Sequence, residues 1–169
     1  MWRLLRHDWP LHFILLLTNW LPDNVSFIRL RGRLAKPFFK KCGVNLGIGR
    51  NVTFYNPSTI EIGNDVYIAF GCWFLGAGSV VIEDEVMFGP YVVVSPSNHT
   101  KLGNSYRFGE PSSSNITIKS GSWIGAHSTI VIGANVGKGS LIAANSVLNK
   151  STEDNSVYGG VPAKFIKFV

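Results

Sequence analysis

The chain has little cysteine and little charge. Only two cysteines, Cys42 and Cys72, occur among its 169 residues. Two cysteines exclude a disulfide framework, and their spacing matches no metal-binding motif. We therefore expect ordinary thiols in a reducing compartment. Charged residues make up only 15% of the chain, while glycine contributes 18 residues. This composition is typical of a chain that turns often and buries many short strands.

Long apolar runs are also missing. The longest candidate, Leu11–Leu17, is much shorter than the roughly 20 apolar residues that a membrane-spanning helix needs. A signal peptide fits poorly as well, because Asp8 and Pro10 interrupt the approach and no small-residue cleavage site follows Trp20. We expect the mature chain to begin at Met1 and to lie in the cytoplasm. The length suits one domain with one core.

The positive charge is confined to the N-terminal segment. The whole chain carries a net charge of +6. Residues 1–41 contain eight basic and two acidic residues, which already gives +6, whereas residues 42–169 contain eight of each. Because no nucleic-acid-binding motif accompanies this charge, we do not expect a nucleic-acid partner.

An aliphatic residue recurs every six positions toward the C-terminus. The series is Ile118, Ile124, Ile130, Val136, Ile142 and Leu148. A small residue follows most of them four positions later, at Ser122, Ser128, Ala134, Ser140 and Ser146. Earlier series with the same spacing are Ile62, Ile68, Phe74 and then Ile82, Phe88, Val94, with a weaker start at Ile48 and Phe54.

A period of six fits neither an α-helix nor an alternating strand. It is typical of a coil with three flat sides, in which the aliphatic residue points inward and the small residue lies near a corner. Stacked coils pair strand to parallel strand and bury a continuous aliphatic column. The sequence therefore predicts an all-β fold, a parallel β-helix over residues 44–169.

Residues 95–115 interrupt this repeat. They show no period and contain many turn-forming residues. We predict a long loop that leaves the β-helix at one corner. Because long excursions from regular folds usually carry function, this loop is the first place to look for a site.

Residues 1–43 precede the repeat and are predicted to be mainly helical. The first apolar helix is expected to break near Pro10 and to end by Leu21-Pro22, and Asp23 or Asn24 is expected to cap a second helix. For the second segment a strand is the alternative, because basic and apolar residues alternate at Arg29, Arg31 and Arg33.

Two roles remain open for this leader, and they are compatible. It can cap the open end of the β-helix, which otherwise presents unpaired backbone groups. Residues 1–41 can also make peripheral contact with an anionic membrane through their apolar and basic side chains.

Residues 44–169 resemble the hexapeptide-repeat acyltransferases. The resemblance is carried by the repeat, the loop with Asn98-His99, the unit Trp123-Ile124-Gly125, and the ending Gly159-Gly160-Val161-Pro162-Ala163-Lys164. The most similar members are the galactoside, maltose and streptogramin acetyltransferases and the bacterial polysaccharide O-acetyltransferases of the colanic-acid type. The resemblance implies a left-handed β-helix, a homotrimer, and transfer of an acetyl group from acetyl-CoA to a sugar or surface-polysaccharide hydroxyl.

The resemblance also implies that His99 is the catalytic base. A hydroxyl is a poor nucleophile until its proton is leaving, and neutral imidazole is suited to removing that proton near pH 7. The partner that orients the imidazole stays open among Asn98, Glu110 and nearby backbone carbonyls. His127, at a turn of the repeat, is interpreted as structural.

The acetyl-CoA site is implied by further matching positions. Trp123 corresponds to an aromatic residue beside the pantetheine arm, and Ala126 and Ala144 to positions whose backbone groups pair with that arm. Backbone N–H groups near Gly125-Ala126 would stabilise the oxyanion. The C-terminal residues that match the segment near the adenosine end are Pro162, Lys164 and Lys167.

The acceptor site departs from the family pattern. The galactoside and maltose enzymes have an asparagine before the loop, where this sequence has Gly71. Trp73, Phe74 and Tyr91 either line a flatter site for a longer glycan or pack under the loop. Candidate acceptor residues are therefore Gly71, Trp73, Tyr91 and Glu110.

Other functions also remain open. The same fold could acetylate a sugar amine or an antibiotic hydroxyl, or it could serve as a non-catalytic scaffold. A metal site of the carbonic-anhydrase kind would need three histidines on neighbouring coils. Only His99 and His127 lie in the repeat region, so no metal is expected.

Overall fold

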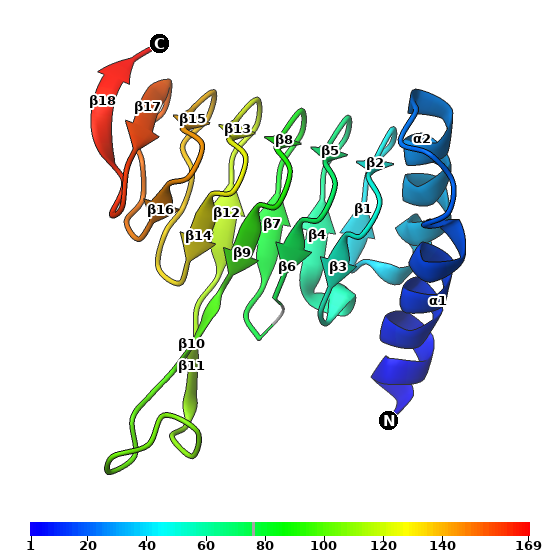
Figure 1. The fold of residues 1–169 in the computed structure, drawn as a ribbon, viewed down its shortest axis with the longest axis horizontal. Helices are drawn as coiled ribbons and strands as arrows, with labels where there is room; N and C mark the ends of the chain where they lie inside the picture. The colour runs from blue at the N-terminus through cyan, green and yellow to red at the C-terminus, as the bar shows by residue number, and fades with distance from the viewer. Residues whose placement is uncertain (76) are drawn as a thin grey trace.

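Three sheets, parallel except for the last strand pair, wind around one axis in the computed structural model, which describes residues 1–75 and 77–169. Figure 1 shows the coils stacked side by side, with helices at the N-terminal end of the stack and one hairpin projecting from it. The predicted β-helix is confirmed.

The strands are two to five residues long and alternate between the sheets. Sheet A contains β1 (Lys41–Cys42), β4 (Ile60–Ile62), β7 (Val80–Ile82) and β12 (Ile116–Ile118). Sheet B contains β2 (Gly47–Ile48), β5 (Tyr67–Ile68), β8 (Met87–Phe88), β13 (Trp123–Ile124), β15 (Leu141–Ile142), β17 (Ser156–Gly159) and β18 (Lys164–Phe168). Sheet C contains β3 (Thr53–Phe54), β6 (Trp73–Phe74), β9 (Val93–Ser95), β14 (Thr129–Val131) and β16 (Val147–Leu148).

The inward positions of the coils are the aliphatic residues of the six-residue repeat. In sheet B the residues that pair in register and are fully buried are Ile48, Ile68, Phe88, Ile124 and Ile142. The predicted small residues are buried too, and the Ser122 hydroxyl donates to the Gly137 carbonyl at 2.7 Å. The pattern works because a small side chain fits a corner where volume is scarce and its hydroxyl satisfies a buried carbonyl.

The early coils are longer than the later ones, which explains why the repeat is irregular there. Cys42 pairs with Ile62 and Ile62 with Ile82, a step of 20 residues, whereas Ile124 pairs with Ile142, a step of 18. One longer corner forms the 3₁₀ turn η3 (Pro57–Thr59).

The interruption of the repeat is a β-hairpin, as predicted for an excursion. Strands β10 (Ser97–His99) and β11 (Pro111–Ser113) pair antiparallel. They follow β9 of sheet C and precede β12 of sheet A, so the hairpin leaves the prism at the corner between these two sheets (Figure 1).

The leader is helical. It contains the π-helix η1 (Leu4–Asp8), α1 (Trp9–Thr18), α2 (Val25–Ala35) and the 3₁₀ turn η2 (Lys36–Phe38). The break expected near Pro10 is a change from π- to α-helix, because proline fits the first turn of α1 without losing a hydrogen bond. Asn24 is the cap of α2, since its side chain accepts from the Phe27 N–H at 3.0 Å. The strand alternative for the second segment is wrong.

These helices close the open edge of the first coil. Three backbone N–H groups of that coil donate to leader side chains: Arg50 to Asp23 at 3.0 Å, Asn51 to Asn19 at 3.0 Å, and Asn56 to Asp8 at 3.1 Å. The fully buried Arg31 donates to the Ile48 carbonyl at 3.2 Å and pairs with Asp23 at 2.7 Å. The leader therefore does cap the β-helix, which satisfies backbone groups that would otherwise be unpaired.

Candidate functional site

The projecting hairpin carries His99 at the end of β10. His99 lies opposite Pro111 of β11, and its side chain is exposed. The side-chain oxygen of Asn98 accepts a hydrogen bond from the His99 backbone N–H at 2.9 Å. Asn98 and His99 line a hollow of about 460 Å³ together with Tyr106 and Arg107. The hairpin thus places an imidazole on the wall of an open hollow.

Tyr106 and Arg107 were not singled out from the sequence. The signal that the sequence offers is an aromatic residue beside an arginine within a segment of turn formers. Across the loop, the Thr100 hydroxyl donates to the backbone carbonyl of Glu110. The Glu110 backbone therefore helps to tie the two sides of the loop together.

Trp123 lies in an apolar row on the outer face of sheet B. It pairs with Met87 of β8 on one side and with Leu141 of β15 on the other. Its side chain is 47% exposed. Because alternate residues of a strand point to opposite faces, the burial of Ile124 fixes Trp123 on the outside.

The turns after these strands stack in a column. A Cβ on Gly89 would lie 2.7 Å from the Ala126 nitrogen, and one on Gly125 would lie 2.5 Å from the Ala144 nitrogen. Glycine is therefore required at both positions for the coils to approach. The Gly125 N–H donates to the Ile142 carbonyl at 2.7 Å. The structure brings Gly125, Ala126 and Ala144 together along one edge of sheet B.

The C-terminal hairpin continues this edge. Strand β18 pairs antiparallel with β17, with Lys164 opposite Gly159 and Lys167 opposite Val157. Both lysines are exposed, and Pro162 lies in the connection between the strands. A Cβ on Gly159 would lie 3.2 Å from the Ala143 side chain, so this hairpin begins beside the turn that contains Ala144.

Gly71 and Tyr91 are in direct contact on adjacent coils. Gly71 has a φ of +72°, and a Cβ there would lie 2.6 Å from two ring carbons of Tyr91. The Tyr91 ring stacks on His127 of the next coil, with centroids 4.9 Å apart. Tyr91 therefore fills the space that any side chain at position 71 would need. His127 is at a turn, as predicted, and packs against this ring.

The other two predicted aromatics differ from each other. Trp73 is 45% exposed and stacks on Tyr55 at 6.1 Å, so it is available at the surface. Phe74 is fully buried between Phe54 and Phe88, so the alternative in which it lines an acceptor site is wrong. The reason is the strand alternation, which turns Phe74 into the core when Trp73 points outward.

Within one chain, the hairpin and the sheet B edge lie apart. Figure 1 shows β10 and β11 projecting from the prism on the side away from β13 and β15. The candidate base, His99, therefore does not meet Trp123 or Ala144 of the same chain. The donor-site candidates form one cluster and the loop candidates another.

Neither thiol nor metal chemistry is indicated near these clusters. Cys72 is buried and its thiol donates to the Gly89 carbonyl at 3.2 Å, and burial raises its pKa to about 11. Within the described ranges, 1–75 and 77–169, no three His, Cys, Asp or Glu side chains are grouped to hold a metal ion.

Comparison with known proteins gives sequence relatives as well as structural ones. No protein-family model matches the chain. Over 145 residues it is 33% identical to the galactoside O-acetyltransferase of Escherichia coli K12, covering 86% of this chain and 71% of that protein. It is 30% identical over 128 residues to a provisionally named lipopolysaccharide biosynthesis O-acetyl transferase of the same strain, covering 70% and 62% of the two chains.

A solved structure agrees with these relatives. A galactoside acetyltransferase in complex with coenzyme A aligns with a TM-score of 0.82 and 31% sequence identity. The alignment covers 94% of this chain and 78% of that chain. Both the β-helix and the N-terminal helices are therefore included in the likeness.

Proposed function

Because the chain belongs to the family of the galactoside O-acetyltransferases and their hexapeptide-repeat relatives, we propose that it is an acetyl-CoA-dependent O-acetyltransferase. The acceptor is a hydroxyl of a sugar or of a bacterial surface polysaccharide precursor. The observation that carries this proposal is the column of Trp123, Gly125-Ala126 and Ala144 along one edge of sheet B. Small residues and an exposed indole in one line suit a long, narrow ligand.

The donor lies along this edge. The apolar row of Met87, Trp123 and Leu141 offers a surface for the pantetheine arm, and the small side chains of Ala126 and Ala144 allow its amides to approach the backbone. The exposed Lys164 and Lys167, on the hairpin beside the Ala144 turn, neutralise the phosphates as point charges. Pro162 shapes the connection between the two strands.

His99 acts as the general base. The imidazole takes the proton of the acceptor hydroxyl while its oxygen attacks the thioester carbonyl carbon. The resulting oxyanion is stabilised by the Ala126 N–H, because the neighbouring Gly125 and His127 N–H groups donate to the Ile142 and Pro90 carbonyls. When the tetrahedral intermediate collapses, the carbon–sulfur bond breaks and the CoA thiolate takes the proton back from the imidazolium. Asn98 helps by holding the His99 backbone.

The active site is shared between chains of a homotrimer. The hairpin that carries His99 projects on the side away from β13, the strand of Trp123 (Figure 1), so one chain alone does not assemble both halves of the site. A neighbouring chain supplies the missing half in this proposal. Flat prism faces provide the surfaces on which such chains pack.

The acceptor is larger than a simple galactoside. The Tyr91 ring covers Gly71, and Trp73 stands exposed on the neighbouring sheet. Aromatic faces bind the apolar faces of sugar rings, so these residues favour a flatter, longer glycan. Glu110, at the loop, is the candidate polar contact.

A glycan carried on a lipid would be reached from a membrane surface, so we also propose peripheral contact through residues 1–41 at the cytoplasmic face.

The test is thiol release from acetyl-CoA with a panel of monosaccharides, amino sugars and oligosaccharides. For His99→Ala we expect turnover to fall about 10²–10⁴-fold, because a positioned base contributes that much. Acetyl-CoA affinity should stay within about twofold of wild type. His12→Ala, a histidine of the leader, is the control. Near-normal turnover of His99→Ala at saturation would show that His99 is not the base.

Mixing variants tests whether the site is shared. His99→Ala and Ala144→Trp, which blocks the donor edge, should each be inactive alone. When the two chains are refolded together, some interfaces combine an intact His99 with an intact Ala144, and activity should return. No recovery in mixed assemblies would place the whole site within one chain.

A further inference from the structure

Helix α1 is apolar on both of its sides. Leu11 and Leu15 face the core and are 2% and 7% exposed. On the other side Trp9, Phe13 and Leu16 are spaced by four and three residues, so they share one face of the helix. Each of these three side chains is more than half exposed. A helix that is apolar all round is normally covered on all sides, yet here only one side is covered by the protein.

Tryptophan marks both ends of this outward face. Trp2 precedes η1 and is 86% exposed, and Trp20 follows α1 and is 80% exposed. Tryptophan is enriched where proteins meet the headgroup region of a bilayer, because its ring is apolar and its N–H is polar. In the part of the chain that the structure describes, no helix has the length and apolarity to cross a membrane. This arrangement is typical of a helix that lies on a membrane surface.

The positive charge of the leader favours a bilayer over a second copy of the chain as the partner of this outward face. In the leader, Arg31 is paired with Asp23. Lys40 and Lys41 are paired with Glu61. The exposed cations without an ion pair among the described residues of this segment are Arg6, Arg29, Arg33 and Lys36. Two leaders packed against each other would bring these like charges near one another, whereas an anionic bilayer attracts them.

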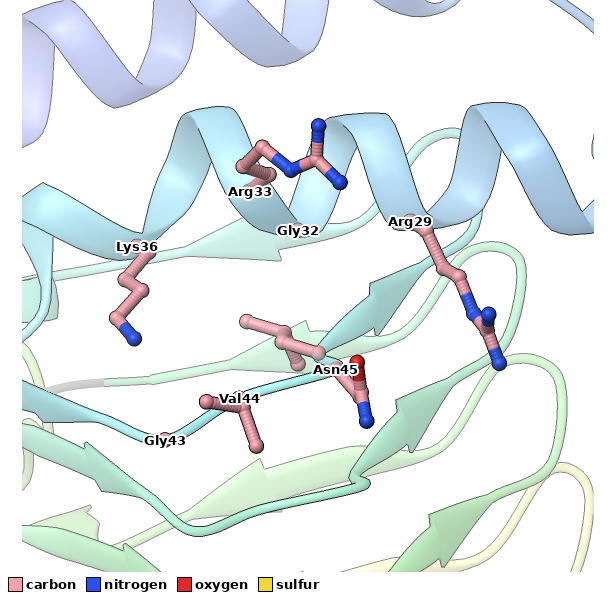
Figure 2. A pocket seen from close by; sticks show the side chains of 8 residues that line it. Arg29, Gly32, Arg33, Lys36, Gly43, Val44 and Asn45 are labelled. Atoms are coloured by element: carbon pink, nitrogen blue, oxygen red, sulfur yellow. The ribbon is translucent and has the colours of Figure 1, made fainter.

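Three of these cations line one hollow. It has a volume of about 300 Å³ and lies between α2 and the segment Gly43–Leu46. In Figure 2 the side chains of Arg29 and Lys36 extend from the helix toward this segment, and Arg33 lies on the helix between them. A Cβ on Gly32 would overlap the Leu46 backbone, so the helix sits directly on the coil. Guanidinium groups bind phosphate oxygens in pairs of parallel hydrogen bonds.

We propose that the outward face of α1 docks on an anionic phospholipid bilayer, with Trp2, Trp9 and Trp20 at headgroup depth. Arg29, Arg33 and Lys36 bind the phosphates of the same lipids. This inference rests on the peripheral contact proposed above for residues 1–41 and not on the acetyl-transfer chemistry.

The test is flotation of the full chain with vesicles of phosphatidylcholine, with and without phosphatidylglycerol. We expect wild type to float only with the anionic vesicles. Arg29→Gln/Arg33→Gln should weaken binding about 30-fold, since each basic residue near such a surface is worth roughly a factor of five. Lys138→Gln/Lys150→Gln, which removes the same charge from the far end of the prism, should bind like wild type. Trp9→Ser/Phe13→Ser should abolish flotation while its circular dichroism spectrum stays unchanged.

Two results would overturn the proposal. One is a wild-type chain that stays in the soluble fraction with anionic vesicles. The other is Trp9→Ser/Phe13→Ser reducing the mass of the assembly in sedimentation, which would identify the face as a contact between copies. Acetyl transfer to a water-soluble acceptor should be the same for both leader variants and wild type. An inactive chain that still floats would therefore refute the proposed activity and leave the docking surface intact.

Discussion

Replacing Arg31 by methionine should remove a fully buried link between the leader and the β-helix. Its side chain is fully buried, donates to Asp23 at 2.7 Å, and also donates to the backbone carbonyls of Thr18, Leu21 and Ile48. Methionine fills a similar volume but leaves the Leu21 and Ile48 carbonyls without this donor, whereas Thr18 and Asp23 keep the Leu21 and Arg50 N–H groups. Asp23 is only partly buried and keeps its pair with Arg50, so the cost is that of lost hydrogen bonds from a charged donor, about 1.5–3 kcal/mol. We expect a loss of that size in the free energy of unfolding.

Urea unfolding followed by circular dichroism measures this loss. The midpoint should fall while the slope of the transition stays unchanged, which means that stability and not compactness has changed. Arg33→Met is the matched control, because its side chain is exposed on the same helix and should cost less than about 0.5 kcal/mol. A loss below about 1 kcal/mol for Arg31→Met, or one equal to the control, would refute the assignment of Arg31 as a link.

Two further predictions concern the donor and acceptor sites. Lys164→Ala should weaken acetyl-CoA binding several-fold in calorimetry and leave turnover at saturation nearly unchanged; a large loss of saturated turnover would contradict a role in phosphate binding alone. Gly71→Asn should destabilise the chain by about 1–3 kcal/mol, because the new Cβ meets the Tyr91 ring. The same substitution in a Tyr91→Ala background should cost much less, and equal costs in both backgrounds would show that the ring is not the obstacle.

The coils were predictable because their pattern is local. An inward residue such as Ile124 is specified by its own position in a six-residue unit, and its neighbours Phe88 and Ile142 repeat that specification on adjacent coils. Register then follows from burial, since a slip of one residue would turn every inward side chain outward. The small corner residues were predictable for the same reason.

The leader was predictable only in part. Alternation of Arg29, Arg31 and Arg33 with apolar residues suggested a strand as well as a helix. The helix is held because Arg31 bonds to Asp23, to backbone carbonyls of the segment after α1, and to the Ile48 carbonyl at the edge of the first coil. Those partners depend on where the chain turns after α1 and on the first coil already being formed. No local pattern contains that information.

The candidate site also contains residues that the repeat could place and residues that it could not. Ala126 and Ala144 could be placed together from the repeat alone, since they occupy the same position one coil apart. The pairing of His99 with Pro111, and the hollow it forms with Tyr106 and Arg107, lie in a segment without a period. Likewise, the contact between Gly71 and Tyr91 depends on which way an exposed ring turns. The sequence places residues along a coil, but it does not fix the direction of side chains outside the prism.

The spacing of the coils gives a physical reason for the pantetheine binding that we propose on this edge of sheet B. Parallel strands lie about 4.8 Å apart, so the turns at Ala126 and Ala144 present backbone groups at that interval. Extended peptide rises about 3.3–3.6 Å per residue. The β-alanine unit between the two amides of pantetheine adds one methylene, which brings their separation to roughly 5 Å. The two intervals match, so an arm lying along the stack can meet one coil with each amide. A helix or an antiparallel sheet edge would not repeat identical turns at this distance, whereas a β-helix does so at every coil.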